Sequence, residues 1–426
     1  MIMNITQALE YIHSVSWMGS QPGLERITAL MASLGDPQKK LRFVHIAGTN
    51  GKGSTAALTA SALYRAGYTT GLYTSPYIQC FNERMQVNGR RILDRELAEI
   101  TEIVQPHADR MDPRPTEFDL VTAIGLIYFA RKKCDYVVLE AGMGGALDST
   151  NVIPAPECAV LTNIGLDHTQ FLGSTVEKIA ETKAGIFKPG SHAVLYEQSP
   201  SVTAVVRQAC ERVGIPLEIA DFSQLRCLSR DLEGQRFTYK GHGPYKIRLA
   251  GVHQLKNAAV ALEILDVLRS RGAAIPEDAV MRGFAETAWP ARFEVLSRDP
   301  WFILDGGHNP QCAETVAANL KTYFPGRHMI LLMGVLGDKD YPGLTDILAP
   351  AASEFVTVTP NCTRALPAEE LAEFLHGRYG KPVQSCGSIA EGVETALALA
   401  REKDGVVCCV GSLYMAGAVR ECFGLS

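Results

Sequence analysis

The sequence lacks three features that would assign it to a special class: a long apolar run, a cluster of basic residues and a closely spaced cysteine pair. No apolar stretch approaches the ~18–20 residues of a membrane-spanning helix, and the N-terminus shows no basic flank followed by an apolar core. We therefore expect a cytoplasmic protein without a membrane partner. A formal net charge of -5 without a lysine- or arginine-rich block argues against nucleic acid as a partner.

The cysteines also exclude some kinds of site. The chain contains 11 of them, dispersed singly except for the neighbours Cys408 and Cys409. Without a C-x-x-C pair, the sequence indicates neither a zinc site nor a redox motif. A hydrophobic content of 46% with 20% charged residues is that of an ordinary globular chain. We therefore expect reduced and mostly buried thiols.

The length of 426 residues favours two domains, because a single hydrophobic core stops growing near ~250–300 residues. Strand and helix patterns alternate through most of the chain, which is typical of an α/β fold. The pattern breaks around Trp289–Phe293, so we place the boundary between an N-terminal domain of residues 1–295 and a C-terminal domain of residues 296–426. Within the first domain, residues 75–92 are expected to be a long irregular loop, whereas residues 226–249 look β-rich.

A glycine-rich turn stands between a predicted strand and a predicted helix. The apolar run Leu41–Ile46 indicates a buried strand, and Ser54–Arg65 indicates a helix. Between them the sequence reads Ala-Gly-Thr-Asn-Gly-Lys-Gly. Glycines allow backbone N–H groups to approach a phosphate, the helix N-terminus adds positive potential, and a lysine reaches the terminal phosphoryl oxygens. The strict phosphate-loop pattern is not met, because Gly53 separates Lys52 from Ser54, so an ordinary strand-to-helix turn remains the alternative.

Acidic residues follow two further predicted strands. Glu140 ends the apolar run that begins at Asp135, and Asp305 ends another strand; glycines follow both acids. Ligands of open parallel sheets bind at the carboxyl ends of the strands, and a carboxylate placed there can complete a magnesium-nucleotide site. His168 follows a third strand and is expected near Glu140. The alternatives are a solvated turn acid for Glu140 and a structural role for the histidine.

These motifs belong to a set that occurs in family order along nearly the whole chain. The matching stretches are Gly23–Ile27, Ala47–Ser54, Tyr73–Pro76, Asn82–Arg84, Glu140–Gly145, Leu147–Asn151, Asp167-His168, Lys183–Gly185, His253-Gln254 with Asn257, Arg292, and Asp305–Asn309. As a set they resemble the folate branch of the Mur ligase family, the folylpolyglutamate and dihydrofolate synthases. Gly53 is characteristic of this branch. Four positions, Tyr77, Ala146, Ala291 and Gly307, depart from common family residues and leave the fine substrate choice open.

The resemblance implies a P-loop-type, mostly parallel ATPase domain followed by a smaller Rossmann-like α/β domain. It implies an ATP-dependent ligase that adds L-glutamate to the carboxylate of a reduced folate or of dihydropteroate through an acyl phosphate. ATP and a pair of Mg²⁺ sites would be the cofactors, a K⁺ requirement stays open, and a monomer is expected. A UDP-muramoyl peptide is the alternative acceptor, although residues before the phosphate-loop strand leave no room for a UDP-binding domain. A nucleotide-dependent switch would need an N-K-x-D motif, which is lacking.

The resemblance also implies roles for individual residues. Those expected to take part in catalysis are Lys52, Lys183 and His308. Those expected to bind ATP are Gly48, Thr49, Asn50, Gly51, Lys52, Gly53, Ser54, Asn257, Arg292 and Asp305. Those expected to bind metal are Ser75, Glu140, His168 and, if it is carbamylated, Lys183. Thr116 and Phe118 are expected to contact the substrate, and an unmodified Lys183 that pairs with phosphate remains the alternative to the carbamate.

Overall fold

The computed structural model describes residues 3–19, 21–167 and 169–425. Its largest sheet has eight strands in the order β4-β3-β2-β5-β1-β6-β7-β8. Strands β2, β5, β1, β6, β7 and β8 pair in parallel, and β3 and β4 extend the sheet in antiparallel fashion. The strands are β1 (Phe43–Ala47), β2 (Thr70–Tyr73), β3 (Met85–Val87), β4 (Arg90–Arg91), β5 (Tyr136–Glu140), β6 (Cys158–Leu161), β7 (His192–Tyr196) and β8 (Leu217–Ala220).

Helices cover both faces of this sheet, and for that reason β1, β5 and β6 are buried along their whole length. On one face lie α3 (Lys52–Arg65), α9 (Val252–Ser270) and α10 (Glu277–Glu286). The helices that pack elsewhere on the sheet are α1 (Ile5–His13), α2 (Glu25–Ser33), α4 (Asp94–Ala108), α5 (Glu117–Arg131), α6 (Thr169–Leu172), α7 (Val176–Ala184) and α8 (Pro200–Val213). The predicted parallel α/β domain is therefore confirmed.

The prediction of an irregular loop over residues 75–92 was wrong for its second half. β3 and β4 form a hairpin there, after the short 3-10 helix η3 (Phe81–Arg84). Asn88 and Gly89 connect the two strands with φ angles of 53° and 72°. An Asn-Gly pair is a strong local signal for a two-residue hairpin turn, because both residues adopt positive φ at low cost. The sequence therefore contained this signal.

A small antiparallel sheet follows, as the β-rich pattern of residues 226–249 predicted. It contains β9 (Leu225–Asp231), β10 (Gly234–Tyr239) and β11 (His242–Ile247), with β10 in the middle. Phe237, Tyr245 and Ile247 point from this sheet into the core that α9 and α10 share with the large sheet. The small sheet is therefore part of the N-terminal half of the molecule.

The third sheet has six strands in the order β12-β13-β17-β14-β15-β16, all parallel except β12. Its strands are β12 (Glu294–Arg298), β13 (Trp301–Leu304), β14 (Met329–Met333), β15 (Glu354–Thr357), β16 (Val383–Ser385) and β17 (Val406–Val410). Its helices are α11 (Pro310–Tyr323), α12 (Tyr341–Leu348), α13 (Ala368–Tyr379), α14 (Ile389–Glu402) and α15 (Ala416–Glu421). This smaller α/β unit was expected, and we propose residue 295, next to the start of β12, as its boundary.

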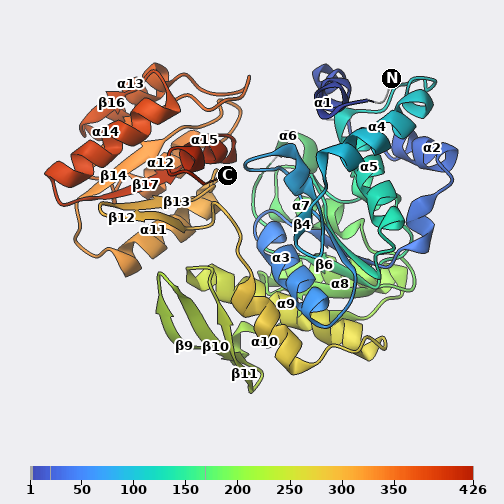
Figure 1. Cartoon of the computed structure of the whole chain (residues 1–426). Coiled ribbons are helices and arrows are strands. Elements are labelled where there is room, and N and C mark those ends of the chain that lie inside the picture. Colours follow the sequence, from blue (N-terminus) through green and yellow to red (C-terminus); the bar gives the residue numbers. More distant parts are fainter. Residues whose placement is uncertain (1–2, 20, 168, 426) are drawn as a thin grey trace.

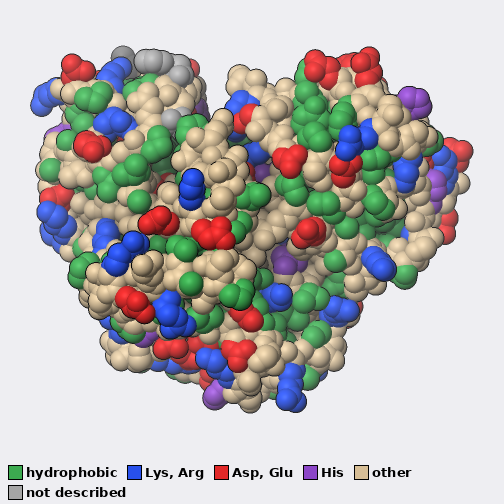
Figure 2. All heavy atoms as spheres, turned by 180° about the vertical axis from the view of Figure 1, so that it is seen from behind, with side chains coloured by type: hydrophobic (Ala, Val, Ile, Leu, Met, Phe, Trp, Pro, Cys, Tyr) green, Lys and Arg blue, Asp and Glu red, His purple; other side chains and the backbone are tan. Residues whose placement is uncertain are grey.

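The two α/β units stand side by side, and the small antiparallel sheet lies below them (Figure 1). Seen from behind, acidic and basic side chains are interspersed over the visible face (Figure 2). No helix in the described part of the chain is long and apolar enough to cross a membrane. The carboxyl ends of β1, β5 and β6 meet at one edge of the large sheet, which is where the parallel arrangement predicts a ligand site.

Candidate active site

The glycine-rich turn Gly48–Gly53 connects the buried strand β1 to α3, as predicted. Gly51 has a φ of 89°, and a Cβ atom at this position would lie 2.5 Å from Oδ1 of Asn257. Gly53 lies in the first turn of α3 with ordinary φ, but a Cβ there would lie 2.9 Å from Nε1 of Trp289. Both glycines therefore permit close contacts, one with α9 and one with the segment that leads to the C-terminal domain.

A cavity of about 250 Å³ opens between this turn and the C-terminal domain. Its wall includes most of the residues proposed from the sequence: Gly48, Thr49, Asn50, Gly51, Lys52, Gly53, Ser54, Ser75, Glu140, Lys183, Asn257, Arg292, Asp305 and His308. These residues come from both domains, so the fold assembles them only when the domains meet. His168 lies outside the described residues.

Two lysines converge on the carbonyl oxygen of Gly48. Nζ of Lys52 donates to it at 3.2 Å and to the carbonyl of Thr49 at 3.2 Å, and Nζ of Lys183 donates to it at 2.9 Å. Burial, and to a lesser extent the positive charge of Lys52, together lower the pKa of Lys183 to about 7. An amine with such a pKa is substantially neutral near neutral pH, which makes it available as a nucleophile.

Glu140 lies at the end of β5 and is only 5% exposed. One carboxylate oxygen accepts a hydrogen bond from the backbone N–H of Ser75 at 3.3 Å. Burial raises the pKa of Glu140, while the charges of Lys52 and Arg292 partly oppose that rise. A buried carboxylate with incomplete compensation would be stabilised by a further cation in the cavity.

On the opposite wall, Asp305 follows the last residue of β13 and forms hydrogen bonds with the segment between the domains. Its carboxylate accepts hydrogen bonds from the backbone N–H groups of Phe293, at 2.9 Å, and Gly307, at 2.8 Å. Burial raises the pKa of Asp305, and the neighbouring Arg292 opposes the rise. Asp305 therefore both lines the cavity and fixes the segment that carries Arg292.

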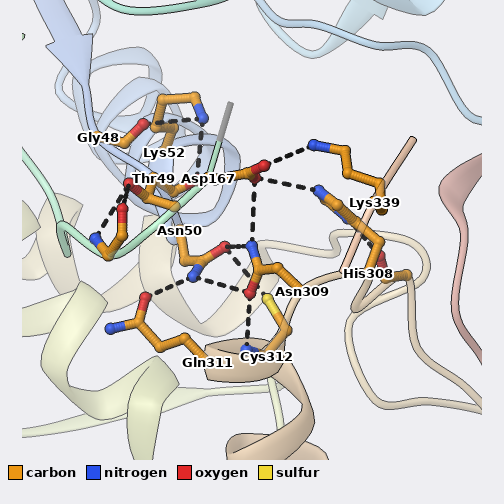
Figure 3. A network of polar contacts seen from close by, with 12 residues as sticks. Gly48, Thr49, Asn50, Lys52, Asp167, His308, Asn309, Gln311, Cys312 and Lys339 are labelled. Carbon is orange, nitrogen blue, oxygen red and sulfur yellow. Dashed lines mark hydrogen bonds and ion pairs between the residues drawn. The ribbon is translucent and has the colours of Figure 1, made fainter. Parts of the chain in front are cut away.

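Asp167 connects the domains beside the cavity (Figure 3). Its Oδ1 atom lies 2.5 Å from Nζ of Lys339, and its Oδ2 atom accepts a hydrogen bond of 3.4 Å from Nδ2 of Asn309. Nε2 of His308 lies 3.7 Å from Oδ2 of the same carboxylate. All three partners belong to the C-terminal domain, and Asp167 belongs to the loop after β6.

Several residues of the wall were missed from the sequence, and two of them, Gln311 and Cys312, contact the phosphate loop. Gln311 accepts a hydrogen bond of 2.7 Å from Nδ2 of Asn50, and the thiol of Cys312 donates to Oδ1 of Asn50 at 3.1 Å (Figure 3). Both lie in the first turn of α11, directly after the recognised Asp305–Asn309 stretch. That adjacency was a signal, but only the docking of α11 against the phosphate loop brings these side chains to Asn50.

The two residues proposed for substrate contact do not line this cavity. The hydroxyl of Thr116 caps α5 by accepting from the N–H of Asp119 and also donates to the carboxylate of that residue. Phe118 lies directly behind the wall, because a Cβ on the lining residue Gly142 would be 2.5 Å from its Cζ. Within the described residues, no group of three Asp, Glu, His or Cys side chains is arranged to hold a metal ion by itself.

Comparison with protein families gives two matches that together span most of the chain. Residues 46–265 match the Mur ligase middle domain, and residues 291–413 match the Mur ligase glutamate ligase domain. The first match contains the phosphate loop and Glu140. The second begins at Ala291 and contains Asp305 and His308.

Individual relatives match over nearly their full length. The chain is 36% identical to the dihydrofolate synthase/folylpolyglutamate synthase of Bacillus subtilis, with 97% of this chain and 98% of that protein covered. It is 35% identical to the folylpolyglutamate synthase of Lacticaseibacillus casei, with 98% of both covered. Its fold is similar to that of the Mycobacterium tuberculosis folylpolyglutamate synthase complexed with ADP and AMPPCP, with a TM-score of 0.91, 31% identity and 99% of both chains covered. The chain therefore belongs to the folylpolyglutamate and dihydrofolate synthase branch of the Mur ligase family.

Proposed function

We propose that the protein is an ATP-dependent ligase that joins L-glutamate to the carboxylate of a reduced folate, of dihydropteroate, or of both. The observation that carries this proposal is the cavity in which the phosphate-loop residues Gly48–Ser54 face Glu140, Arg292 and Asp305. The relatives named dihydrofolate synthase and folylpolyglutamate synthase support a folate as the acceptor and glutamate as the added group.

The chemistry requires activation, because a carboxylate is a poor acceptor for an amine. An oxygen of the folate carboxylate forms a bond to the γ-phosphorus of ATP, and the bond from this phosphorus to ADP breaks. The glutamate nitrogen then attacks the carbonyl carbon of the acyl phosphate, and the carbon–oxygen bond breaks as phosphate leaves with the electron pair. The nitrogen loses its proton to a base. Such a reaction needs mainly positioning and charge stabilisation from the protein.

The residues of the cavity suit these tasks. The N–H groups at the start of α3 would provide donors for phosphate oxygens, and Lys52 would provide a mobile positive charge. Asn257, Arg292 and Asp305 would contact the nucleotide from the other walls. Lys52 at present donates to backbone carbonyls, so binding of a phosphate would exchange these weak partners for a charged one.

We propose that His308 is the base that accepts the proton from the glutamate nitrogen. Its Nδ1 atom lies 3.0 Å from the carbonyl oxygen of Gly306, an acceptor only, so the proton of the neutral ring resides on Nδ1. Nε2 is then free to accept a proton from the amine of glutamate. The nearby carboxylate of Asp167 would stabilise the resulting imidazolium.

Mg²⁺ fits the donor set, because the buried Glu140 carboxylate has its pKa raised by burial and a nearby cation would favour its charged form. Ser75 and Glu140 would hold the ion together with His168. When bound, Mg²⁺ would neutralise charge on the phosphate oxygens. Lys183 would join this set after the nitrogen of its neutral amine forms a bond to CO₂ and loses a proton, which leaves a negatively charged carbamate in place of the amine. The same proposal includes a K⁺ requirement, which is tested by measuring activity as a function of K⁺ concentration.

The acceptor would reach the cavity past Gly142, with Phe118 behind the wall and Thr116, the cap of the same helix, supporting its ring system. We further propose that the enzyme works as a cytoplasmic monomer. The described cysteines are all free thiols, which accords with a reducing compartment.

The deciding experiment measures ADP release by the purified protein with Mg-ATP, K⁺ and L-glutamate. Dihydropteroate, tetrahydrofolate and a UDP-muramoyl peptide are compared as acceptors. We expect turnover with at least one pterin, and Lys52→Ala should reduce kcat/KM by about 10²–10³-fold because a phosphate-stabilising charge is removed. Lys40→Ala, an exposed lysine outside the cavity, is the matched control. Turnover with the muramoyl peptide alone would contradict a folate acceptor.

A further inference from the structure

Arg420 is a buried arginine of α15, on the side of the C-terminal domain that faces the N-terminal domain (Figure 1). Its side chain is only 11% exposed, and it does not line the cavity. A buried guanidinium stays charged and is stable only where acceptors surround it. Its acceptors come from two segments far away in the sequence, Gln79 and Glu294.

The first contact ties α15 to the loop that begins at Ser75. Nε of Arg420 donates to Oε1 of Gln79 at 2.9 Å. The amide of Gln79 in turn donates to the carbonyl oxygen of Leu425 at 2.6 Å, so the C-terminal end of the chain holds the same side chain from a second direction. Gln79 therefore joins the loop to two parts of the C-terminal segment.

The loop itself is internally braced. Oε2 of Glu83 accepts hydrogen bonds from the backbone N–H groups of Ile78, at 2.9 Å, and Gln79, at 3.2 Å. Ile78 also packs against the core of the C-terminal domain, and a Cβ on Gly417 would lie 2.4 Å from its carbonyl oxygen. α15 and the loop are therefore in backbone-to-backbone contact, and a shift of one moves the other.

The other end of this loop reaches the cavity. Ser75 and Pro76 line it, and the N–H of Ser75 donates to Glu140. Only a few residues separate Ser75 from Gln79, and a short, braced segment transmits displacement from one end to the other. The position of the proposed metal ligands Ser75 and Glu140 thus depends on where Gln79 is held.

The second contact ties α15 to the segment between the domains. Nη1 of Arg420 forms an ion pair with Oε1 of Glu294, and Oε2 of Glu294 accepts a hydrogen bond of 2.9 Å from the N–H of Ala291. Ala291 and Phe293 have φ angles of 53° and 50°, in the left-handed region that residues with a Cβ rarely adopt. Such conformations persist only where surrounding contacts enforce them. Arg292, which lines the cavity, lies between these two residues.

We propose that Arg420 is a positioning residue for the nucleotide site. Its guanidinium holds the loop of Ser75 and the segment of Arg292 in a fixed relation, so that both walls are complete only while α15 is docked. The inference rests on the proposed function, in which Mg-ATP occupies the cavity. It makes the C-terminal helix part of the machinery that assembles the site, although no residue of α15 (Ala416–Glu421) lines the cavity.

The test separates the two contacts. Arg420→Met removes both, Gln79→Leu removes the loop contact with nearly unchanged side-chain volume, and Glu294→Gln weakens the ion pair with the inter-domain segment. Arg420→Lys retains the charge, and Glu421→Ala, an exposed neighbour on the same helix, is the matched control. For each protein we measure the half-saturating Mg²⁺ concentration, the KM for ATP, and the Kd of Mg-ADP by calorimetry. Hydrogen exchange of residues 75–84 and 287–294 reports the two segments directly.

We expect Arg420→Met to raise both the Mg²⁺ requirement and the KM for ATP by roughly tenfold, the scale of a lost charge-assisted hydrogen bond. Gln79→Leu should raise mainly the Mg²⁺ requirement, Glu294→Gln mainly the KM for ATP, and Arg420→Lys should recover part of both. Glu421→Ala should match the wild type. The effects of Gln79→Leu and Arg420→Met on the Mg²⁺ requirement should not be additive, because both substitutions remove the same contact between Gln79 and Arg420.

Wild-type Mg²⁺ and ATP dependence in Arg420→Met and Gln79→Leu would overturn the inference, as would a lowered Tm without any change in these dependences. If Arg420→Met does not fold, the other two variants decide the question. Gln79→Leu should then change mainly the Mg²⁺ requirement, and Glu294→Gln mainly the KM for ATP. Mg-ADP binding needs no acceptor, so it separates the two proposals. Failure of the wild type to bind Mg-ADP would refute the proposed function and this inference with it, whereas normal binding by every variant would refute only the role of Arg420.

Discussion

The carboxylate of Asp167 and the ammonium of Lys339 lie 2.5 Å apart, although 172 positions separate them in the sequence. Their side chains are 10% and 12% exposed, so the pair is largely shielded from solvent. Shielded ion pairs interact more strongly than exposed ones, and removal of one partner leaves a charge in a poorly solvated place. This pair connects the two domains at the rim of the cavity and therefore favours the arrangement in which both walls face each other.

Lys339→Met should weaken that arrangement. We expect kcat/KM for ATP to fall by roughly tenfold or more, because less positive charge then surrounds the Asp167 carboxylate. The double variant Asp167→Asn with Lys339→Met should lose less binding of Mg-ADP than the single lysine variant. Small-angle scattering should report a larger radius of gyration for Lys339→Met. Lys321→Met, an exposed lysine of the same domain, is the control, and an equal loss in that variant would rule out a specific contact.

Glu140→Gln should raise the half-saturating Mg²⁺ concentration by roughly tenfold or more, since the variant lacks a negative oxygen ligand. Because burial raises the pKa of Glu140, protonation should compete with Mg²⁺ as the pH falls, so the wild-type Mg²⁺ requirement should increase toward acidic pH. The glutamine variant should lose most of that pH dependence. A Mg²⁺ titration equal to that of the exposed control Glu211→Gln would show that Glu140 is only a turn residue.

Gly53→Ala should impair ATP binding without unfolding the protein. The new Cβ would lie 2.9 Å from Nε1 and 3.1 Å from Cζ2 of Trp289, so the indole or the phosphate loop must move. We expect a higher KM for ATP and a changed tryptophan emission, and Trp289→Phe in the same chain should restore part of the binding by making room.

The control for that substitution is Gly377→Ala. This glycine is also helical, and a Cβ there meets no atom within 4 Å. Replacement of an open helical glycine should stabilise the protein slightly, by about 0.5–1 kcal/mol. If both alanine variants bind ATP like the wild type, the contact between Gly53 and Trp289 has no role in the site.

The buried lysine of α7 should give stability a defined pH dependence. Burial lowers the pKa of Lys183 from 10.5 to about 7, so between these values the unfolded chain holds a proton that the native chain lacks. Stability should therefore rise with pH over this range, by up to about 1.4 kcal/mol per pH unit. Urea unfolding of wild type and Lys183→Met in CO₂-free buffer measures the difference in stability, which should change between pH 7 and 10.5 and become constant below pH 7, where both states of the wild type hold the proton. A constant difference from pH 7 to 9 would contradict the lowered pKa.

The same neutral amine should react with CO₂. We expect protein kept in ¹³C-bicarbonate to show a carbamate carbon signal by NMR that Lys183→Met lacks. If an active wild-type enzyme lacks this signal, Lys183 is not carbamylated, and its role is to pair with phosphate as an unmodified lysine.

Local patterns in the sequence were sufficient for the parts of the site that lie within a few residues of one another. The apolar strand ending at Ala47, the glycines after it and the helix that follows predict a phosphate loop, because each element depends on neighbouring residues. Glu140 and Asp305 were placed at strand ends for the same reason. The Asn88-Gly89 turn was equally local, and its hairpin could have been predicted.

Contacts between distant segments were decided by the tertiary structure alone. No spacing rule brings Gln311 to Asn50 or Lys339 to Asp167. Each depends on how one domain rests on the other, which follows from the packing of complete surfaces rather than from any local period. The sequence by itself determined the phosphate loop, the strand-end acids and the α/β class. Only the packing of the two domains decided which side chains share the cavity.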